Sequence, residues 1–267
     1  MRRARRRNRH DGRAVNTSPN TSPNPPAGVP AGGAPPAAAV DALAPGFPAT
    51  WVVVPLYCEA SVIGDVVRGL RERFSHVVCV DDGSTDASAR AAQDAGAVVV
   101  RHAVNLGQGA ALQTGVAYAL RDPLTRSVVT FDADGQHRVE DAAAMVRRLH
   151  AEGLDVVFGS RFLDRRTELD RLRRLVLRAA VVYTNRTTGM RLTDAHNGLR
   201  VLSREGAATL RIRHNRMAHA SEIVHQVGRS GLRWAEHPVH VLYTDYSRSK
   251  GQSLLNSVNI LVETLLG

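Results

Sequence analysis

Short apolar runs recur along this chain from about residue 50 onward, and their lengths are those of buried strands. Valine-rich runs occupy residues 51–55, 76–80, 97–100 and 127–131, and a fifth run covers residues 155–160. Within these runs the apolar residues are largely continuous rather than alternating with polar ones. Continuous runs are typical of parallel strands that are covered on both faces. The pattern therefore predicts a buried, mostly parallel sheet.

The segments between these runs have the spacing of helices. Residues 60–73 repeat apolar side chains with a period close to 3.6. A helix opened by glycines is expected near residues 105–121, with Asn105 as its cap, and a further helix near residues 139–151. Strands that alternate with helices predict a single α/β domain with a Rossmann-like sheet and helices on both faces.

Clusters of polar residues stand at the ends of four predicted strands. Their sequences are PLYCE, DDGSTD, DADGQH and SRF. In open α/β sheets, ligands bind beyond the carboxyl ends of the strands, where the strand order reverses. The four clusters are therefore expected to converge on one binding site.

The cluster DADGQH places two carboxylates, Asp132 and Asp134, at the end of a strand that should be buried. Their mutual repulsion is costly unless a positive charge lies between them. Mg²⁺ and Mn²⁺ prefer oxygen ligands, and Mg²⁺ usually takes one or two carboxylates together with substrate phosphates. Gln136 adds a neutral oxygen. A D-x-D pattern alone is a weak signal, because it occurs by chance in many loops.

The net charge of +10 is unevenly distributed over the 267 residues. Residues 1–48 carry half of it and are otherwise rich in Pro, Ala, Gly, Asn, Ser and Thr, a composition that predicts a disordered tail. Downstream there is no basic face rich in aromatic residues of the kind that stacks bases, so no nucleic-acid partner is expected. We expect residues 49–251 to form the domain and residues 252–267 an amphipathic C-terminal helix.

Compartment signals point to the cytoplasm. The two cysteines, Cys58 and Cys79, cannot form a disulfide framework and are interpreted as reduced thiols. No apolar run approaches the roughly 18–20 residues that a membrane span needs. The N-terminus lacks the apolar segment of a signal peptide. We therefore expect a cytoplasmic catalytic domain, with peripheral binding to the cytosolic membrane face as a further possibility.

A dinucleotide-binding motif is the main rival interpretation of the glycines in NLGQGAALQTG. Gly107 and Gly109 fit G-x-G-x-x-G, but the third position is Leu112. The segment also follows the third predicted strand, whereas the fingerprint follows the first. A nicotinamide or flavin enzyme is therefore not favoured.

Seven motifs occur in one order along residues 51–254: VVVPLYCEASVI, CVDDGSTD, NLGQGAALQTG, FDADGQH, GSRF, TDAHNGLR and YSRSKGQS. Together they resemble the family 2 glycosyltransferases with the GT-A fold, and within that family the dolichyl- or polyprenyl-phosphate mannosyl- and glucosyltransferases. The resemblance implies inverting, metal-dependent transfer of a hexose from a GDP- or UDP-sugar, with Mg²⁺ or Mn²⁺ as cofactor. It also implies a polyprenyl phosphate as the acceptor.

The resemblance assigns roles to individual residues, each of which also has a structural interpretation such as packing or helix capping. It implies that Asp132, Asp134 and Gln136 bind the metal, with Asp134 also catalytic, and that Arg248 acts catalytically on phosphate. The residues that it assigns to binding of the nucleotide sugar are Pro55, Tyr57, Glu59, Val80, Asp82, Asp132, Ala133 and Arg161. For Arg161, an ion pair with Asp132 is the alternative to substrate contact.

Two positions depart from the family pattern. Cys58 stands where the family usually has asparagine, so a hydrogen bond from an amide is expected to be lost. Leu254 stands where the mannosyltransferase branch often has lysine, unless Lys250 supplies that charge. These departures keep a second hypothesis open, in which the chain is a catalytically idle nucleotide-sugar-binding or scaffold protein.

The need for a general base depends on the acceptor. A sugar hydroxyl would need one, and Asp194 and Glu222 are the candidates. A lipid phosphate is already anionic near neutral pH and needs orientation instead. Either carboxylate could instead be structural. A hydroxyl acceptor, with one of the two carboxylates as its general base, remains the alternative.

Contacts with a membrane are expected late in the chain. Residues 165–186 predict a basic amphipathic helix suited to an interface, although packing on the domain would explain the same pattern. Residues 252–267 predict a second helix that is too short and too polar to span a bilayer. A separate membrane partner could supply the transmembrane segment that some members of the branch carry.

Overall fold

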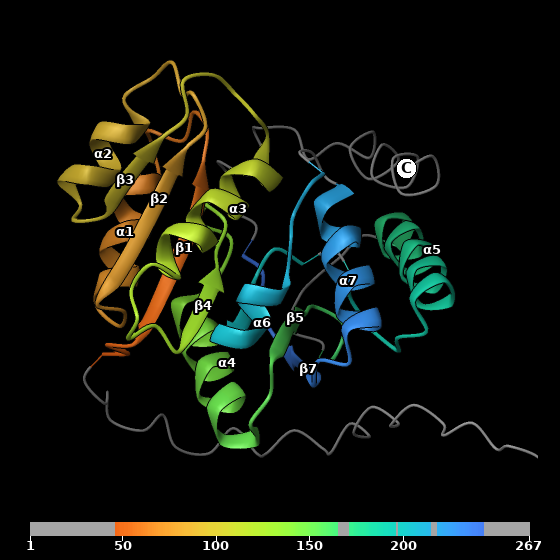
Figure 1. Ribbon diagram of the computed structural model, residues 1–267. Helices are drawn as coiled ribbons and strands as arrows, with labels where there is room; N and C mark the ends of the chain where they lie inside the picture. The colour runs from red at the N-terminus through yellow and green to blue at the C-terminus, as the bar shows by residue number, and fades with distance from the viewer. Residues whose placement is uncertain (1–45, 165–170, 196, 215–217, 243–267) are drawn as a thin grey trace, which may run out of the picture.

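The computed structural model describes residues 46–164, 171–195, 197–214 and 218–242. Its first half alternates strands with helices, as the apolar runs predict (Figure 1). The elements in this half are β1 (Thr50–Leu56), α1 (Ile63–Arg71), β2 (His76–Asp81), α2 (Ser88–Asp94), β3 (Val98–Arg101), α3 (Gln108–Ala119) and β4 (Ser127–Thr130).

The second half adds longer helices and short strands. Its elements are α4 (Val139–Glu152), β5 (Val156–Ser160), α5 (Arg171–Thr188), β6 (Arg200–Ser203), α6 (Arg204–Thr209), α7 (Ala218–Ser230) and β7 (Trp234–Pro238). Neither β6 nor β7 is evident from the sequence pattern, because β6 reads RVLS and β7 reads WAEHP, and neither is a continuous apolar run. Residues 1–45 of the expected tail, residues 165–170 and the expected C-terminal helix lie outside the described residues. Phe47, which the prediction placed in the tail, stacks on Phe74.

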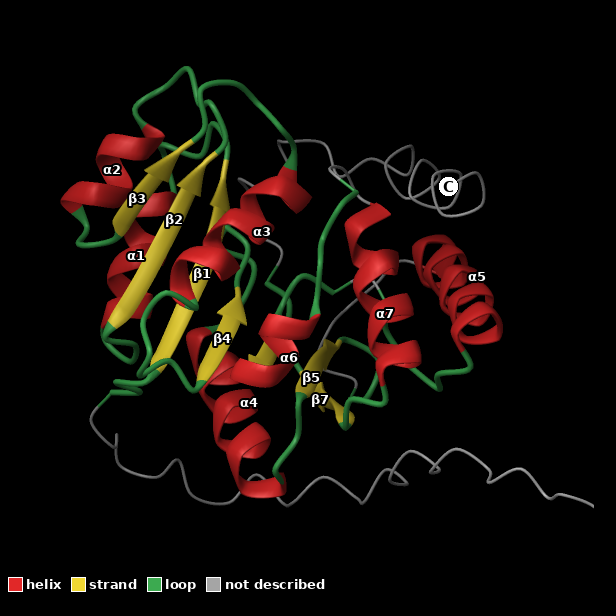
Figure 2. Ribbon diagram, in the orientation of Figure 1, coloured by secondary structure: helices red, strands yellow, loops and turns green. Residues whose placement is uncertain are grey.

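Within the described residues, seven strands form one sheet in the order β3-β2-β1-β4-β6-β5-β7. Figure 2 shows this sheet and labels its strands other than β6. All neighbouring strands run parallel except β6, which is antiparallel to both β4 and β5. The prediction of a mostly parallel α/β sheet is confirmed. Since β1 pairs with β2 on one side and with β4 on the other, the strand order reverses at β1, and a ligand site is expected beyond the carboxyl ends of β1 and β4.

Helices cover both faces of the sheet, each over its own apolar core. Along β1, Val52 and Val54 enter the core under α1, α2 and α4. Val53 enters the core on the opposite face, under α3, α6 and α7. Side chains of successive strand residues point to opposite faces, so a continuous valine run supplies both cores at once.

The helix α3 packs against the sheet at very short range. A Cβ atom added to Gly115 would come closer than 3.0 Å to Val53, so only glycine allows this approach. The helix begins at Gln108 with Gly107 as its N-cap, and the prediction that Asn105 caps it is wrong. The carboxylate of Asp82 instead accepts the N–H groups of Leu106 and Gly107, at 2.9 and 2.7 Å, and fixes the chain just before the helix.

The described part of the basic helix α5 lies beside α7 (Figure 1). Val181 is buried, whereas Arg178 and Ala179 are exposed and Val182 is 47% exposed. The helix therefore packs on the domain through Val181 and also exposes an apolar side chain, that of Val182, to solvent. No helix within the described ranges is long and apolar enough to cross a membrane.

Candidate active site

The candidate site is centred on Asp132, directly after β4. Its Oδ2 lies 2.9 Å from Nε2 of His137, and its Oδ1 accepts Nε2 of Gln108 at 3.2 Å. Gly198 packs against the carboxylate so closely that an added Cβ would come within 3.0 Å of both oxygens. Thr130 donates to the carbonyl of Gly198 at 2.8 Å and holds it there. These contacts leave Asp132 little freedom to move.

Asp134 lies near this carboxylate, and the two influence each other's ionisation. Burial and the charge of Asp132 raise the pKa of Asp134 to about 6, although the backbone N–H of Gln136 donates to it at 3.0 Å. Burial also raises the pKa of Asp132, but the hydrogen bond and charge of His137 and the charges of Arg200 and His219 lower it overall. Asp132 is therefore the more acidic of the two carboxyl groups.

Two repelling carboxylates are a donor set that fits a hard divalent cation. In the part of the chain that the structure describes, no group of three or more His, Cys, Asp or Glu residues is arranged to hold a metal ion. Asp132 and Asp134 would therefore need further oxygen ligands from a substrate. Gln136, the expected third ligand, is 7% exposed, and its role stays a prediction.

Arg200 is a component of the site to which the sequence analysis assigns no role, although it ends the motif TDAHNGLR. It lies on β6, opposite Thr130 of β4, and its side chain is 1% exposed. Burial lowers the pKa of its guanidinium to about 10, while the charges of Asp132 and Asp194 act in the opposite direction. Two signals in the sequence pointed to it, namely its place at the end of that motif and its position inside the apolar segment LRVL.

Arg161, at the end of β5, is bound by Asp194 rather than by Asp132. Its Nε and one terminal nitrogen donate to the two carboxylate oxygens of Asp194 at 2.6 and 2.8 Å, and its backbone N–H donates at 3.1 Å. The expected alternative pair of Arg161 with Asp132 is therefore corrected. Asp194 is 2% exposed, so this is a buried, bidentate ion pair. A general base with both oxygens bound is poorly placed to accept a proton, and the base role of Asp194 stays a prediction.

Glu236 on β7 holds the turn that carries Asp194. Its carboxylate accepts the N–H groups of Thr193 and Asp194 at 2.8 and 2.9 Å, and the hydroxyl of Thr193 at 3.0 Å. Burial and the charge of Asp194 raise the pKa of Glu236 to about 7, although these hydrogen bonds act in the opposite direction. The charged form of Glu236 is thus disfavoured in the folded protein.

The raised pKa of Glu236 predicts a dependence of stability on pH. Because the folded protein binds the proton more tightly than the unfolded chain, stability falls as pH rises from about 4.5 to about 7. Glu236→Gln removes this dependence, so the stability of wild type relative to the variant should fall by roughly 2 kcal/mol between pH 5 and pH 8. Urea unfolding at both pH values measures the difference. The exposed Glu152→Gln is the control, and equal slopes for wild type and Glu236→Gln would contradict the prediction.

Glu222 on α7 is bound into a loop. It accepts the N–H groups of Arg213 and His214, both at 2.9 Å, and Nε2 of Gln226 at 3.2 Å. Its carboxylate therefore fixes residues 213 and 214 against α7. The structure gives Glu222 a structural task, and its catalytic role stays a prediction.

The loop after β1 is tied to the loop after β2. The N–H of Cys58 donates to Oγ of Ser84 at 3.0 Å, and the N–H of Glu59 donates to Oγ of Ser88 at 2.7 Å. Cys58 has φ of 54°, a left-handed conformation that asparagine tolerates better than cysteine does. Tyr57 is 47% exposed beside it, whereas the backbone before it, including Pro55, is buried in β1.

Asp82 and Val80, both assigned to nucleotide binding, are buried at the end of β2. Asp82 lies 2.7 Å from Nδ1 of His102, in addition to its two backbone donors, and Nε2 of His102 lies 3.0 Å from the hydroxyl of Thr114. The carboxylate thus clamps the segment before α3. Its contact with a base or ribose stays a prediction, as does that of Ala133, which is buried beside Asp132.

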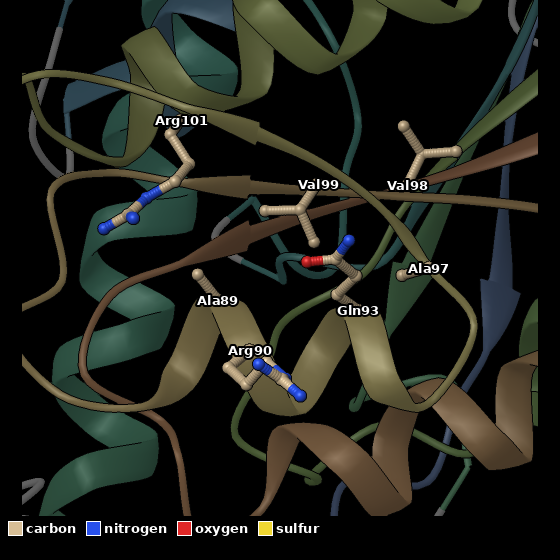
Figure 3. Close-up of a pocket in the computed structure, with 7 residues that line it drawn as sticks. All are labelled: Ala89, Arg90, Gln93, Ala97, Val98, Val99 and Arg101. Carbon is tan, nitrogen blue, oxygen red and sulfur yellow. The ribbon is translucent and has the colours of Figure 1, made fainter.

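A shallow groove lies apart from these carboxylates, at the outer edge of the sheet between α2 and β3 (Figure 3). Two arginines line it, and both already form ion pairs. Arg90 binds Asp94 at 2.9 Å, and Arg101 binds Asp81 at 2.8 Å. The groove contributes none of the residues that the sequence singles out. Arg248, which does belong to them, lies outside the described residues.

Comparison with known proteins identifies relatives over most of the chain. Residues 51–211 match the family model described as glycosyl transferase family 2. An uncharacterised protein from Methanocaldococcus jannaschii is 35% identical over 81% of this chain and 90% of its own length. The UDP-N-acetylglucosamine–dolichyl-phosphate N-acetylglucosaminyltransferase of Methanococcus voltae is 25% identical over 81% of this chain and 94% of its own.

A solved structure has the same fold. Glucosyl-3-phosphoglycerate synthase from Mycobacterium tuberculosis, crystallised with Mn²⁺ and UDP-glucose, superposes with a TM-score of 0.63 over 82% of this chain and 78% of its own. The sequence identity between the two is 21%, so this likeness concerns the fold.

Proposed function

This chain belongs to glycosyl transferase family 2 and is a nucleotide-sugar-dependent glycosyltransferase, and we propose that it transfers a hexose, with inversion, to a polyprenyl phosphate. The observation that carries the proposal is the presence of two sites at the same edge of the sheet, at the carboxyl ends of two parallel strands that β6 separates. Asp132 and Asp134 follow β4, and the buried ion pair of Arg161 with Asp194 follows β5. The first suits a donor diphosphate with its cation, and the second holds the guanidinium of Arg161 in a fixed orientation at the same edge.

The donor half of the proposal rests on the carboxylates. Asp132, fixed by His137 and Gln108, and Asp134 would hold Mg²⁺ or Mn²⁺, and the bound cation would neutralise charge on the leaving diphosphate. Tyr57 and the loop that carries Glu59 would border the nucleotide of a GDP- or UDP-hexose. A protein of the same fold binds Mn²⁺ and UDP-glucose, which supports this arrangement.

The acceptor half of the proposal rests on the contacts of Asp194 and Glu222. Both carboxylates were candidates for the general base, and both are already bound by other groups. Asp194 is bound by Arg161, and Glu222 is bound by the backbone of residues 213 and 214. A phosphate acceptor needs no deprotonation, so this arrangement does not impede it. The Methanococcus relative is named as a dolichyl-phosphate transferase, which supports the same class of acceptor. Binding at a membrane surface, through the exposed Val182 side of α5 or through a separate partner, belongs to the same proposal.

Transfer assays with matched acceptors test the proposal. We expect sugar transfer to a short polyprenyl phosphate, and little to polyprenol without the phosphate or to free sugars. Glu222→Gln should cost much less than the roughly 10²–10⁴-fold that loss of a general base costs. Its folding is checked by thermal unfolding, since the carboxylate holds residues 213 and 214.

The alternatives predict different results in these assays. Efficient transfer to a hydroxyl acceptor, with none to the lipid phosphate, would overturn the acceptor proposal and return Asp194 or Glu222 to the role of base. A chain that binds nucleotide sugar but neither transfers nor hydrolyses it would support the idle scaffold, for which the strained Cys58 is the main structural argument.

A further inference from the structure

Arg200 is a buried cation in an unusual state. Its side chain is 1% exposed, and none of its three guanidinium nitrogens has a hydrogen-bond partner among the residues that the structure describes. A buried guanidinium normally forms several hydrogen bonds, because it loses its hydration on burial. A guanidinium that is buried without hydrogen bonds needs nearby negative charges to stabilise its charged form.

The compensating charges are those of the candidate site. Arg200 on β6 pairs with Thr130 on β4, and Thr130 precedes Asp132 by two residues in the sequence. The negative charges of Asp132 and Asp194 favour the ionised form of Arg200. It therefore provides a permanent positive charge beside one of the two carboxylates that would hold the divalent cation. The side chain of an arginine stays protonated under working conditions.

We propose that Arg200 is a positioning residue that makes divalent-cation binding depend on the donor diphosphate. With Arg200 in place, the carboxylates of Asp132 and Asp134 bind Mg²⁺ or Mn²⁺ weakly by themselves. A nucleoside diphosphate brings the negative charge and the oxygen ligands that make binding favourable. This inference rests on the proposed function, because it assumes that the site takes a nucleoside diphosphate together with the cation.

Two further features of the site support this dependence. Both oxygens of Asp132 are already engaged, by His137 and Gln108, so a cation must compete with existing partners. Gly198 packs against the same carboxylate, so little space is left on that side for a new ligand geometry. Two carboxylates are also fewer ligands than Mg²⁺ or Mn²⁺ takes, and the diphosphate oxygens fill part of the difference.

The test is a thermodynamic cycle for Mn²⁺ and UDP, repeated with GDP. Free Mn²⁺ is measured by electron paramagnetic resonance with wild type, Arg200→Met and Arg200→Lys, with and without nucleotide. Arg200→Met should bind Mn²⁺ alone about tenfold or more tightly than wild type, because a like charge is removed. The nucleotide should then strengthen Mn²⁺ binding less than it does in wild type, and by reciprocity Mn²⁺ should strengthen nucleotide binding less. Arg200→Lys keeps the charge and should resemble wild type.

The direction of the change separates this role from a structural one. A merely structural arginine would weaken Mn²⁺ binding when replaced, or leave it unchanged. The matched control is Arg204→Met, at the start of α6, where the guanidinium binds the carbonyls of Leu120, Asp122 and Thr125. This variant should lose stability without any gain in Mn²⁺ affinity. Should Arg200→Met not fold, Arg200→Gln takes its place.

Failure of the inference can be told apart from failure of the proposed function. If wild type binds Mn²⁺ equally well with and without nucleotide, within about threefold, the inference is overturned even when every variant is unstable. It is also overturned if Arg200→Met leaves Mn²⁺ binding unchanged while the wild-type protein binds UDP or GDP in a Mn²⁺-dependent way. If neither nucleotide binds to wild type with Mn²⁺, the proposed function itself fails.

Discussion

The Asp134→Asn variant should lose Mn²⁺-dependent binding of the donor and roughly 10²–10³-fold or more of its transfer activity. Asparagine is nearly the same size, so the fold should persist, but a neutral amide binds a hard cation far more weakly than a carboxylate does. Titration with UDP and GDP, with and without Mn²⁺, measures the first effect, and transfer to polyprenyl phosphate the second. A variant that still binds nucleotide more tightly when Mn²⁺ is added would show that Asp134 is not a ligand.

The same variant should be more stable than wild type when no metal is present. Burial and Asp132 raise the pKa of Asp134 in the folded protein to about 6 from 3.8, so ionisation of Asp134 destabilises the fold. This cost appears as pH rises through about 4 to 6, and it is absent below that window. We therefore expect Asp134→Asn to gain roughly 1–3 kcal/mol at pH 7.5 and nothing at pH 3.5. Asp65→Asn, at an exposed position on α1, is the control.

Gly198→Ala should cost roughly 10²-fold in transfer, because it displaces Asp132. The added methyl group would come closer than 3.0 Å to both carboxylate oxygens, so Asp132 must leave its contact with His137. The effect should appear in Mn²⁺-dependent donor binding as well as in turnover. Gly69→Ala on α1 adds the same methyl group with its nearest neighbour at 3.8 Å and should leave activity unchanged. Wild-type donor binding in Gly198→Ala would show that Asp132 does not need its present position.

Much of the fold follows from local sequence patterns. The valine runs identify β1, β2 and β4 because each strand supplies both cores and must be apolar throughout. The strands β6 and β7 could not be predicted in the same way. Residues 200–203 include a buried arginine, and residues 234–238 are half-buried at the sheet edge, so neither has a distinctive apolar pattern. Their places depend on pairing with β4 and β5, which no local pattern encodes.

The sequence predicts which residues of the candidate site lie together only where those residues are close in the chain. The pair Asp132 and Asp134 is visible as D-x-D, and its position after a strand gave it meaning. The ion pair of Arg161 with Asp194 joins residues far apart in the chain, and the sequence suggested a different partner for Arg161. Glu222 was a candidate base because a carboxylate can accept a proton from a hydroxyl group. Its hydrogen bonds to the backbone of residues 213 and 214 become evident only in the structure.

Cys58 shows how a departure from a family pattern gains a physical explanation. The sequence indicated the loss of an amide hydrogen bond. The structure adds that position 58 has φ of 54°, so the usual asparagine also suits the backbone conformation there. Cysteine retains the backbone hydrogen bond to Ser84 and accepts a less favourable conformation.

The antiparallel strand β6 sets the order in which the protein can be completed during synthesis. β4 and β5 leave the ribosome well before residues 200–203, yet β6 is the strand that lies between them. Until it emerges, β4 presents an unpaired edge on that side, the kind of edge that promotes association between nascent chains. Arg200 and Gly198 arrive with the same segment, so the strand that closes the sheet also completes the surroundings of Asp132. A partly synthesised chain therefore has neither a finished sheet nor a finished active site.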